Sequence, residues 1–326
     1  MDFVAIDFET ANSKRSSACC LGIAAVRDNE IAYSDSWFIN PTPCHYDSYN
    51  TFLHGISCAD TDSAPTFDEV WREIRPLVSG GVVVAHNAAF DMSVMRNALT
   101  CYGVAFDEFQ FLCTYKLSQL AYPLTGVYRL NNLCSILGIS LDHHAAKSDA
   151  LGCANLLLHI MQEHGLSSIQ DIARRFNISP GVSHPNGYTP CSSSVGHPKS
   201  YGNISVSEIN ALDPIYIDDD FNGKHFAFTG TLASMSRPLA QRLVVQAGGI
   251  AQNGVTKQTN YLVIGIQDES RFAIGKTMSS KTLKALELAK QGQNIQIIYE
   301  NDFTNMIDDE LWAHFVEQLR KEVFAR

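Results

Sequence analysis

The segment VVVAHNAAFD, residues 82–91, joins a short apolar run to the start of a helical pattern. Residues 82–85 are four consecutive apolar residues that follow the Gly80-Gly81 pair. A continuous run of this kind, bounded by a turn signal, predicts a strand buried on both faces of a sheet. Residues 88–102 have helical spacing, so Asp91 should stand in the first turn of the helix that leaves this strand.

The remainder of residues 1–165 predicts a hairpin followed by alternating helices and strands. Such an order predicts an α/β fold with a mixed sheet and helices on both faces. The hairpin turn falls at Asp28-Asn29-Glu30. We expect strands at 3–6, 20–26, 31–39 and 109–113, and helices at 66–78, 114–122, 131–137 and 145–163.

In the second half of the chain, alternating strands and helices are again predicted, after a segment of different composition. Residues 166–176 predict one short helix, and Gly, Pro and Ser supply 14 of the 24 residues at 179–202, which favours an extended linker. Residues 221–307 predict a second, small α/β domain, and residues 308–326 a C-terminal helix with an apolar stripe. The expected domains are therefore 1–165, a helix and linker at 166–220, 221–307, and the helix at 308–326.

Composition favours a cytoplasmic protein. The net charge is negative in the first half of the chain and positive over much of the second. The chain has 326 residues, of which 45% are hydrophobic, and no apolar run long enough to cross a membrane. Its nine cysteines lie mostly in apolar segments, so we expect buried, reduced thiols. Residues 1–165 hold 9 Lys and Arg against 18 Asp and Glu, a net charge of −9, whereas residues 222–305 hold 9 against 5, a net charge of +4.

Four acids and one histidine in the first half have the composition of a metal site for phosphate chemistry. Asp7 and Glu9 are two apart on an expected strand, so both side chains leave the same face. Clustered carboxylates bind hard divalent cations such as Mg²⁺ or Mn²⁺. Two such ions can activate water and steady the leaving oxygen of a phosphate ester, and a histidine can accept the proton. Taken singly, each of these acids is also explained by a structural role. Asp91, for example, is expected in the first turn of a helix, where the helix dipole favours an acidic residue. The candidate residues are Asp7, Glu9, Asp91, His144 and Asp149.

In this order and context, these motifs resemble the DEDDh exonucleases, a DnaQ-like group that includes the proofreading epsilon subunit of bacterial DNA polymerase III. The matching motifs are Asp7-Phe8-Glu9 with Thr10, the segment from His86 to Asp91, and His144 five residues before Asp149. The resemblance covers residues 1–165 and implies an RNase H-like fold with two metal ions, Mg²⁺ or Mn²⁺. It implies that Asp7, Glu9, Asp91 and Asp149 hold the ions and that His144 is the general base.

The same resemblance assigns neighbouring residues. It implies that Thr10 and Phe90 line the pocket for the terminal nucleotide, although Phe90 is equally well explained as a core aromatic. Of the two adjacent histidines, only His144 has the required offset to Asp149, and we expect His143 to be exposed. The chain has Ala11-Asn12 where the common DxETTG form of the motif has Thr-Gly. This departure leaves the expected metal ligands intact but changes the residues expected to fit the 3′ end of the substrate.

Residues 222–307 resemble a BRCT domain of the type found in NAD-dependent DNA ligases. The resemblance rests on Thr229-Gly230, Arg237, Gly248-Gly249 and Ser280-Lys281, together with an apolar run at 261–263. It implies a phosphate pocket formed by Thr229, Gly230 and Lys281, with Arg237 as a fourth contact. A hydroxyl, a backbone N–H and two cations suit a phosphate. Docking to a partner protein is the alternative use of such a domain.

Together these features predict a metal-dependent 3′–5′ exonuclease that acts on single-stranded DNA ends and is targeted by its BRCT domain. The expected partner of the BRCT domain is 5′-phosphorylated DNA or a protein, and no membrane partner is expected. An exoribonuclease of the same fold is one alternative, because no motif reports whether a 2′-OH is tolerated. A non-catalytic BRCT adaptor is another, although an adaptor has no need for all five candidate residues.

Overall fold

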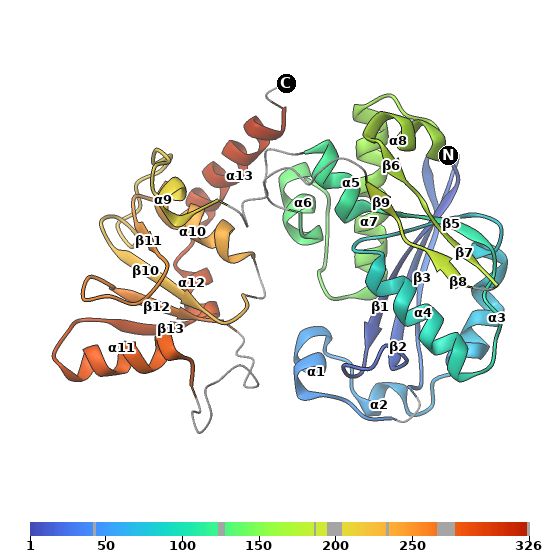
Figure 1. The fold of residues 1–326 in the computed structure, drawn as a ribbon, viewed down its shortest axis with the longest axis horizontal. Helices are drawn as coiled ribbons and strands as arrows, with labels where there is room; N and C mark the ends of the chain where they lie inside the picture. Colours follow the sequence, from blue (N-terminus) through green and yellow to red (C-terminus); the bar gives the residue numbers. More distant parts are fainter. Residues whose placement is uncertain are drawn as a thin grey trace. The chain divides into compact units, whose positions relative to one another are not determined.

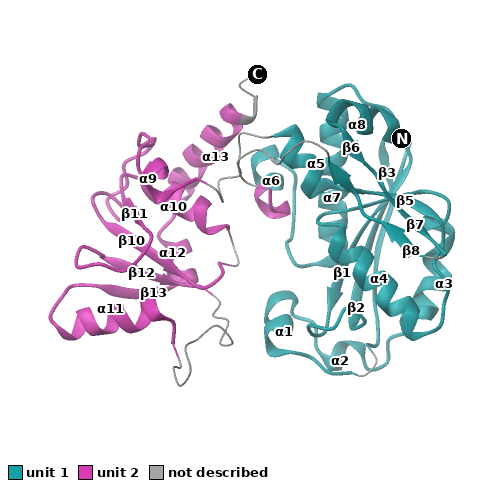
Figure 2. Cartoon of the chain, in the orientation of Figure 1, with its two compact units in different colours: residues 1–122, 133–198 teal, residues 123–132, 199–326 magenta. Residues whose placement is uncertain are grey.

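The computed structural model describes residues 1–41, 44–122, 128–185, 187–193, 204–232, 235–265 and 278–324. The chain divides into two compact units, coloured separately in Figure 2. The first unit comprises residues 1–122 and 133–198, and the second comprises residues 123–132 and 199–326. Among the helices in these described ranges, none has the length and apolar character needed to cross a lipid bilayer.

The first unit is built on a seven-stranded mixed sheet with the order β3-β2-β1-β4-β5-β7-β8. Figure 1 shows the ribbon of the chain with its elements labelled. Strand β1 lies inside the sheet, antiparallel to β2 and parallel to β4. The strands are β1 (Phe3–Thr10), β2 (Ala18–Arg27), β3 (Glu30–Phe38), β4 (Val82–Ala85), β5 (Phe109–Cys113), β7 (Gly181–His184) and β8 (Gly187–Thr189). The expected mixed sheet is confirmed, and β4 is buried as its apolar run predicted.

A tight turn forms the hairpin between β2 and β3. Asp28 and Asn29 both have positive φ, 51° and 64°, which is the conformation of a two-residue hairpin turn that Asn and Asp tolerate. Arg27 pairs with Glu30 across this turn. The turn predicted from the sequence is therefore confirmed.

Helices cover both faces of this sheet. Helix α7 (Ala146–Glu163) packs on β1 and β2, on the face from which Asp7 projects. Phe8 leaves the opposite face and packs against Phe67 of α3 (Phe67–Val78), with ring centroids 5.6 Å apart. The other helices assigned wholly or mainly to this unit are α1 (Ser48–His54), α2 (Cys58–Thr61), α4 (Ala89–Cys101), α5 (Thr114–Ala121), α6 (Leu130–Leu137) and α8 (Ile169–Phe176). The short helices α1 and α2 were not anticipated.

Part of the expected linker belongs to the sheet. Strand β7 pairs antiparallel with β5, and β8 continues the sheet beyond it. Gly181 makes this pairing possible, because a Cβ at this position would lie 2.1 Å from the ring of Phe111. Two further short strands, β6 (Ile178–Ser179) and β9 (Ser192–Ser193), form a separate ladder. The prediction of a solvated linker is therefore wrong for residues 181–184, 187–189 and 192–193, which lie in strands, and Gly181 serves close packing there.

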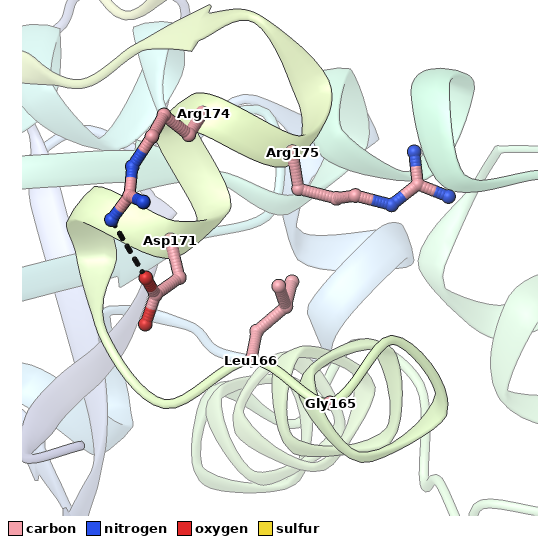
Figure 3. A pocket seen from close by; sticks show the side chains of 5 residues that line it. All are labelled: Gly165, Leu166, Asp171, Arg174 and Arg175. Atoms are coloured by element: carbon pink, nitrogen blue, oxygen red, sulfur yellow. Dashed lines mark hydrogen bonds and ion pairs between the residues drawn. The ribbon is translucent and has the colours of Figure 1, made fainter.

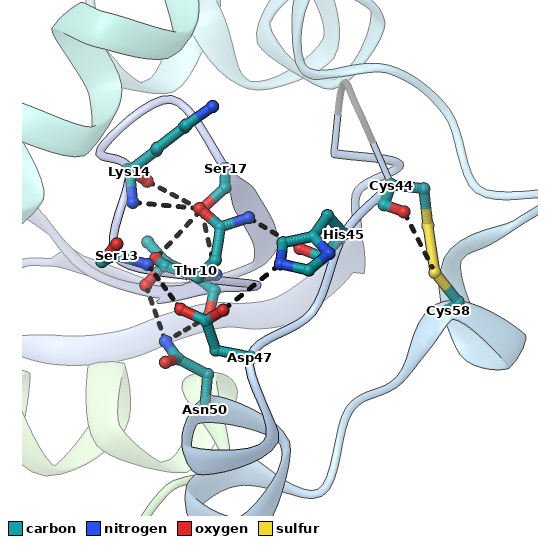
Figure 4. A network of polar contacts seen from close by, with 10 residues as sticks. Thr10, Ser13, Lys14, Ser17, Cys44, His45, Asp47, Asn50 and Cys58 are labelled. Atoms are coloured by element: carbon teal, nitrogen blue, oxygen red, sulfur yellow. Dashed lines mark hydrogen bonds and ion pairs between the residues drawn. A yellow bond between two sulfur atoms is a disulfide. The ribbon is translucent and has the colours of Figure 1, made fainter. Parts of the chain in front are cut away.

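One pair of cysteines departs from the expected reduced thiols. Cys44 and Cys58 are linked by a disulfide, visible in Figure 4, that ties the chain before α1 to α2. The seven other cysteines are free, and all of these except Cys101 are buried. The prediction of reduced thiols thus holds for seven cysteines and is wrong for this pair.

The second unit contains a four-stranded parallel sheet with the order β11-β10-β12-β13. Its strands are β10 (His225–Thr229), β11 (Ile250–Gln252), β12 (Tyr261–Ile264) and β13 (Gln296–Tyr299). Its helices are α9 (Val206–Ile209), α10 (Arg237–Gln246), α11 (Ser280–Lys290), α12 (Glu300–Asn305) and α13 (Asp309–Phe324). The second small α/β fold expected from the sequence is confirmed.

Aromatic packing and one ion pair hold this unit together. Phe303 of α12 is fully buried and meets the rings of Phe226 and Phe228 edge-on. Arg242 of α10 is only 1% exposed, and its guanidinium is paired with Glu322 of α13, with Nη1 donating to Oε2 over 2.9 Å. The C-terminal helix therefore packs on the second unit.

Candidate functional site

Strand β1 carries the first two carboxylates. Asp7 and Glu9 alternate with the buried residues Ile6 and Phe8, so their side chains share one face of the sheet. Asp7 pairs with Gly22 of β2, and Glu9 pairs with Cys20. The pairing register shifts immediately after Glu9, so the regular ladder with β2 ends at the site.

Asp91 reaches the same place from the first turn of α4. This helix follows β4, which runs parallel to β1 and therefore delivers its carboxyl end beside that of β1. Asp91 is 1% exposed, and its Oδ1 accepts a hydrogen bond of 3.1 Å from the backbone N–H of Phe8. A buried carboxyl group is thus fixed to the strand that carries Asp7 and Glu9.

Asp149 comes from the first turn of α7, which approaches β2 very closely. A Cβ atom at Gly22 would lie 2.0 Å from the carbonyl oxygen of Ala146, so only glycine permits this approach. Asp149 is 3% exposed. Carboxylate oxygens of Asp7, Glu9 and Asp149 can all lie within 4.8 Å of one another. Gly22 was not identified from the sequence, although an isolated glycine inside a strand pattern is the signal that marks a close backbone approach.

The pKa values of three of these acids are raised, because their carboxyl groups are buried close to one another. Burial, followed by the neighbouring acids Asp91, Asp149 and Glu9, raises the pKa of Asp7 well above its ordinary value. Burial and the charges of Asp149 and Asp91 raise the pKa of Glu9 to about 8. Burial raises the pKa of Asp91 to about 7, although the hydrogen bond from Phe8 and the charge of Arg15 act in the opposite direction. A hard divalent cation suits this donor set, because it binds carboxylate oxygens and compensates their charge.

Two histidines stand beside Asp149. The backbone N–H of His144 donates to Asp149 Oδ2 over 2.8 Å, and Nδ1 of His143 lies 2.9 Å from Oδ1 of the same carboxylate. His144 has a positive φ of 71°, and its half-buried ring stacks on that of His143 with centroids 3.8 Å apart. His143 was expected to be exposed; its side chain is 33% exposed and contacts Asp149 directly.

The state of His144 suits a proton acceptor. Burial, and then the neighbouring His143, lowers the pKa of His144 to about 4. Its imidazole is therefore neutral near pH 7 and has a free lone pair. His54 also lowers this pKa, so the end of α1 lies within electrostatic range of His144.

Thr10 ends β1, and Phe90 lies in the first turn of α4. Thr10 is 7% exposed, and its carbonyl oxygen accepts a hydrogen bond of 2.8 Å from Nδ2 of Asn50 (Figure 4). The same oxygen lies 3.2 Å from Nε2 of His54. Phe90 is half-buried, and the guanidinium of the exposed Arg15 lies 4.4 Å from its ring centroid. Arg15 and Asn50 were not identified from the sequence, because nothing in their spacing marks a contact with the site.

Asn12 has a structural task at the point where the chain departs from the common motif. It is 6% exposed, and its Nδ2 donates 2.6 Å to the carbonyl oxygen of His45. Its Oδ1 accepts from the backbone N–H of Lys14 over 3.0 Å. Asn12 thus shapes the loop after β1 that carries Arg15.

In the second unit, the four residues expected to bind phosphate lie at one end of β10. Lys281 Nζ donates 2.8 Å to the carbonyl oxygen of Phe228, and Arg237 Nη2 donates 2.5 Å to that of Gly230. Oγ1 of Thr229 lies 2.9 Å from the hydroxyl of Ser279, the N-cap of α11. Burial, and then the charge of Arg237, lowers the pKa of Lys281. The two cationic side chains and the two hydroxyl groups therefore lie around the backbone of residues 228–230.

A hollow of about 390 Å³ lies elsewhere in the first unit (Figure 3). Its lining residues are Gly165, Leu166, Asp171, Arg174 and Arg175. Arg174 is held by Asp171 at 2.9 Å. The lining contains none of the carboxylates described above, so this hollow is separate from their site.

Comparison with known proteins identifies both units. Residues 4–157 match the exonuclease family described as RNase_T, and residues 217–304 match the BRCA1 C-terminus (BRCT) domain. The chain carries an exonuclease domain followed by a BRCT domain. The resemblances expected from the motifs are thereby confirmed.

The relatives match one domain at a time. The exonuclease domain is 33% identical over 159 residues to the PolC-type DNA polymerase III of Clostridium perfringens, covering 48% of this chain and 11% of that protein. It is 31% identical over 165 residues to the 3′-5′ exonuclease DinG of Bacillus subtilis, covering 49% of this chain and 18% of that protein. The chain thus spans less than a fifth of the length of either relative.

A further sequence relative and one solved structure are also similar to this chain. The chain is 36% identical over 107 residues to a DNA ligase of Persephonella marina, covering 33% of this chain and 12% of the ligase. A solved structure of exonuclease X with 5′ overhanging duplex DNA is 23% identical, with a TM-score of 0.44, and covers 53% of this chain and 98% of that one.

Proposed function

We propose that this protein is a divalent-metal-dependent 3′–5′ exonuclease that removes nucleotides from single-stranded DNA ends. The observation that carries the proposal is the convergence of Asp7, Glu9, Asp91 and Asp149 from three elements onto one buried point, with pKa values of about 8 for Glu9 and about 7 for Asp91. Mutually repelling acids are costly to bury, and a metal site explains why the fold collects them. A non-catalytic adaptor would gain nothing from this arrangement.

In this proposal the four carboxylates hold two Mg²⁺ or Mn²⁺ ions. When bound, such ions lower the pKa of a water molecule and steady the leaving oxygen of a phosphate ester. Asp7 is the candidate for the ligand shared by both ions, because its pKa responds to all three other acids. Asp91 is fixed by the Phe8 backbone and Asp149 by the backbone of His144, so neither acid needs to reorient.

His144 acts as the general base in the same proposal. Its neutral imidazole accepts a proton from the attacking water, and the backbone hydrogen bond to Asp149 holds the residue beside the acids. His143 is a positioning residue that restrains Asp149 through its Nδ1 contact. Thr10 and Phe90 contact the terminal nucleotide, and Arg15, stacked on Phe90, lies close enough to Asp91 to lower its pKa.

Hydrolysis of labelled oligonucleotides tests this proposal. Single-stranded DNA with a 5′ label should yield a ladder that shortens from the 3′ end with Mg²⁺ or Mn²⁺, and no products with EDTA. RNA of equal length is the comparison substrate, and preferential degradation of RNA would replace DNA in the proposal by an exoribonuclease substrate. If neither is degraded with metal, while Mg²⁺ does not alter the melting temperature, the proposal fails.

We further propose that the BRCT domain binds a DNA phosphate through Thr229, Gly230, Arg237 and Lys281. In the present geometry both cations donate to backbone carbonyls of one turn, so an arriving phosphate can exchange for these contacts. The net charge of +4 over residues 222–305 favours the same partner. A cytoplasmic location is also part of the proposal: the seven free cysteines favour a reducing compartment, whereas the disulfide between Cys44 and Cys58 favours an oxidising one.

Titration of nicked duplexes with and without a 5′-phosphate tests the pocket. Thr229→Ala with Lys281→Ala should remove the preference for the phosphorylated duplex. Lys284→Ala is the matched control, because Lys284 is an exposed lysine on the same helix. Binding should weaken with salt if phosphate contacts dominate. Equal affinity of the unaltered protein for both duplexes would favour a protein-docking role.

A further inference from the structure

Helix α1 stands at the edge of the carboxylate site with a polar side and an aromatic side. Asn50 and His54, four residues apart, both reach Thr10 at the end of β1. Residues four apart lie on one face of a helix, so this face is turned towards the site. Two independent contacts therefore attach this helix to the proposed catalytic centre.

The other side of α1 presents two large exposed rings. Tyr49 is 47% exposed and Phe52 is 74% exposed, and no residue of this helix is buried. Their spacing of three residues puts the two rings on a common face, well away from the Asn50 and His54 face. Phe52 is the most exposed large apolar side chain among the described residues. Neither ring serves the core of the first unit.

The charge of the first unit limits how a nucleic acid can be held there. Residues 1–165 have a net charge of −9, which does not favour binding a phosphate backbone by charge alone over this part of the sequence. Aromatic rings offer a contact that needs no positive charge, because every nucleobase has a π face on which a ring can stack. Two exposed rings beside an acidic centre therefore fit unpaired bases better than they fit a phosphate backbone.

We propose that Tyr49 and Phe52 form a stacking platform for unpaired bases of single-stranded DNA whose 3′ end lies at the carboxylates. This inference rests on the proposed exonuclease function, because it takes the substrate strand to pass from Thr10 onto α1. Stacking is tolerant of sequence, so the platform provides grip without base preference. It also favours single strands over duplexes, since paired bases keep their π faces within the helix stack.

Binding of the full-length chain to short oligothymidylate tests the platform. Fluorescence anisotropy with Ca²⁺ in place of Mg²⁺, and a gel to verify that the strand stays intact, reports affinity. Tyr49→Ala with Phe52→Ala should weaken binding roughly 5- to 100-fold, the range expected when one stacked base is lost. An oligomer of the same length whose 3′-terminal nucleotides are abasic should bind the unaltered chain and the variant equally.

A matched tyrosine provides the control. Tyr33 on β3 is 43% exposed, close to the 47% of Tyr49, and lies at the far end of β2 from the site. Tyr33→Ala should leave oligothymidylate affinity unchanged, whereas Tyr49→Ala alone should reduce it. The inference is overturned if the Tyr49 and Phe52 variant, with an unchanged melting temperature, binds oligothymidylate like the unaltered chain, or if the abasic strand binds the unaltered chain as tightly as oligothymidylate does.

The two proposals fail in different ways. A chain that binds bases through Tyr49 and Phe52 but hydrolyses no strand with Mg²⁺ or Mn²⁺ would overturn the exonuclease proposal and keep the platform. A chain that hydrolyses DNA but binds abasic and base-containing strands equally would keep the exonuclease proposal and overturn the platform.

Discussion

At the scale of the residue, Glu9 and Asp91 tie the stability of the first unit to pH and metal. Burial raises the pKa of Glu9 to about 8 and that of Asp91 to about 7, from ordinary values of 4.5 and 3.8. Between those limits the folded, metal-free protein binds more protons than the unfolded chain. Its free energy of unfolding therefore falls as the pH rises from about 4 to about 8.

We accordingly expect Mg²⁺ to stabilise the protein more at higher pH. The ion binds ionised carboxylates, so it opposes the repulsion that grows as protons leave. The melting temperature with EDTA should be lower at about pH 8.5 than at about pH 6, and the increase caused by Mg²⁺ should be larger at the higher pH. Asp7→Asn is the control, since removing one charge should stabilise the metal-free form and abolish the Mg²⁺ effect. An equal Mg²⁺ effect at both pH values would contradict this account.

The two adjacent histidines should differ sharply in their effect on rate. His144→Ala should reduce hydrolysis roughly 10²- to 10⁴-fold, the usual contribution of proton transfer, while Mg²⁺ still raises the melting temperature. His143→Ala should cost less, because it removes a restraint on Asp149 and leaves the base. The measurement is single-turnover cleavage of single-stranded DNA at saturating metal. A loss for His143→Ala as large as that for His144→Ala would reverse the assignment.

At the scale of the element, the contact between α7 and β2 depends on Gly22. A methyl group at this position would lie 2.0 Å from the Ala146 carbonyl oxygen, which is backbone and cannot rotate away. Gly22→Ala should therefore push the first turn of α7, and Asp149 with it, away from Asp7 and Glu9. Overpacking of this kind typically costs about 1–3 kcal/mol of stability.

The loss of function in Gly22→Ala should exceed the loss of stability. We expect Mg²⁺ affinity, measured by calorimetry well below the melting temperature, to fall at least about tenfold, since positioned ligands are lost. Gly81→Ala is a suitable control, because its added methyl group would lie 3.4 Å from its nearest neighbour, the carbonyl oxygen of Val78. A folded Gly22→Ala protein with unchanged Mg²⁺ affinity would show that α7 is held at the site by other contacts.

At the scale of the whole molecule, the position of the C-terminal boundary of the first unit, at residue 198, predicts which truncated chains should retain activity. Strands β7 and β8 belong to the seven-stranded sheet, so a chain ending at residue 179 would leave the β5 edge and Phe111 uncovered. A chain ending at residue 198 keeps both strands.

We therefore expect residues 1–198 to cleave short single strands at nearly the rate of the full chain. The BRCT domain should contribute through effective concentration at particular DNA ends, so the truncated chain should lose mainly the digestion of nicked or 5′-phosphorylated duplexes at low enzyme concentration. Residues 1–179 should melt at a lower temperature and aggregate more readily. Equal melting temperatures for the two truncations would show that β7 and β8 add nothing to the sheet.

Periodicity in the sequence was sufficient to predict the elements with strong patterning, and the motifs supplied the candidate acids. The apolar run at 82–85 and the alternation of Asp7 and Glu9 specify their strands locally, and motif order specified which acids to consider. Local signals could not reveal that Gly181 and its neighbours extend the sheet, because a stretch rich in Gly, Pro and Ser has the composition of a linker.

Which residues contact one another depends on how distant segments pack in the folded chain. Gly22, Asn50 and Arg15 act on the site through contacts between segments far apart in sequence, and a single sequence carries no record of such distances. The same holds for His143, whose exposure depends on how the loop before α7 turns at the positive φ of His144. Pairing of Cys44 with Cys58 likewise follows from the path of the chain around α1. Local patterning specifies elements, whereas close packing between them specifies the site.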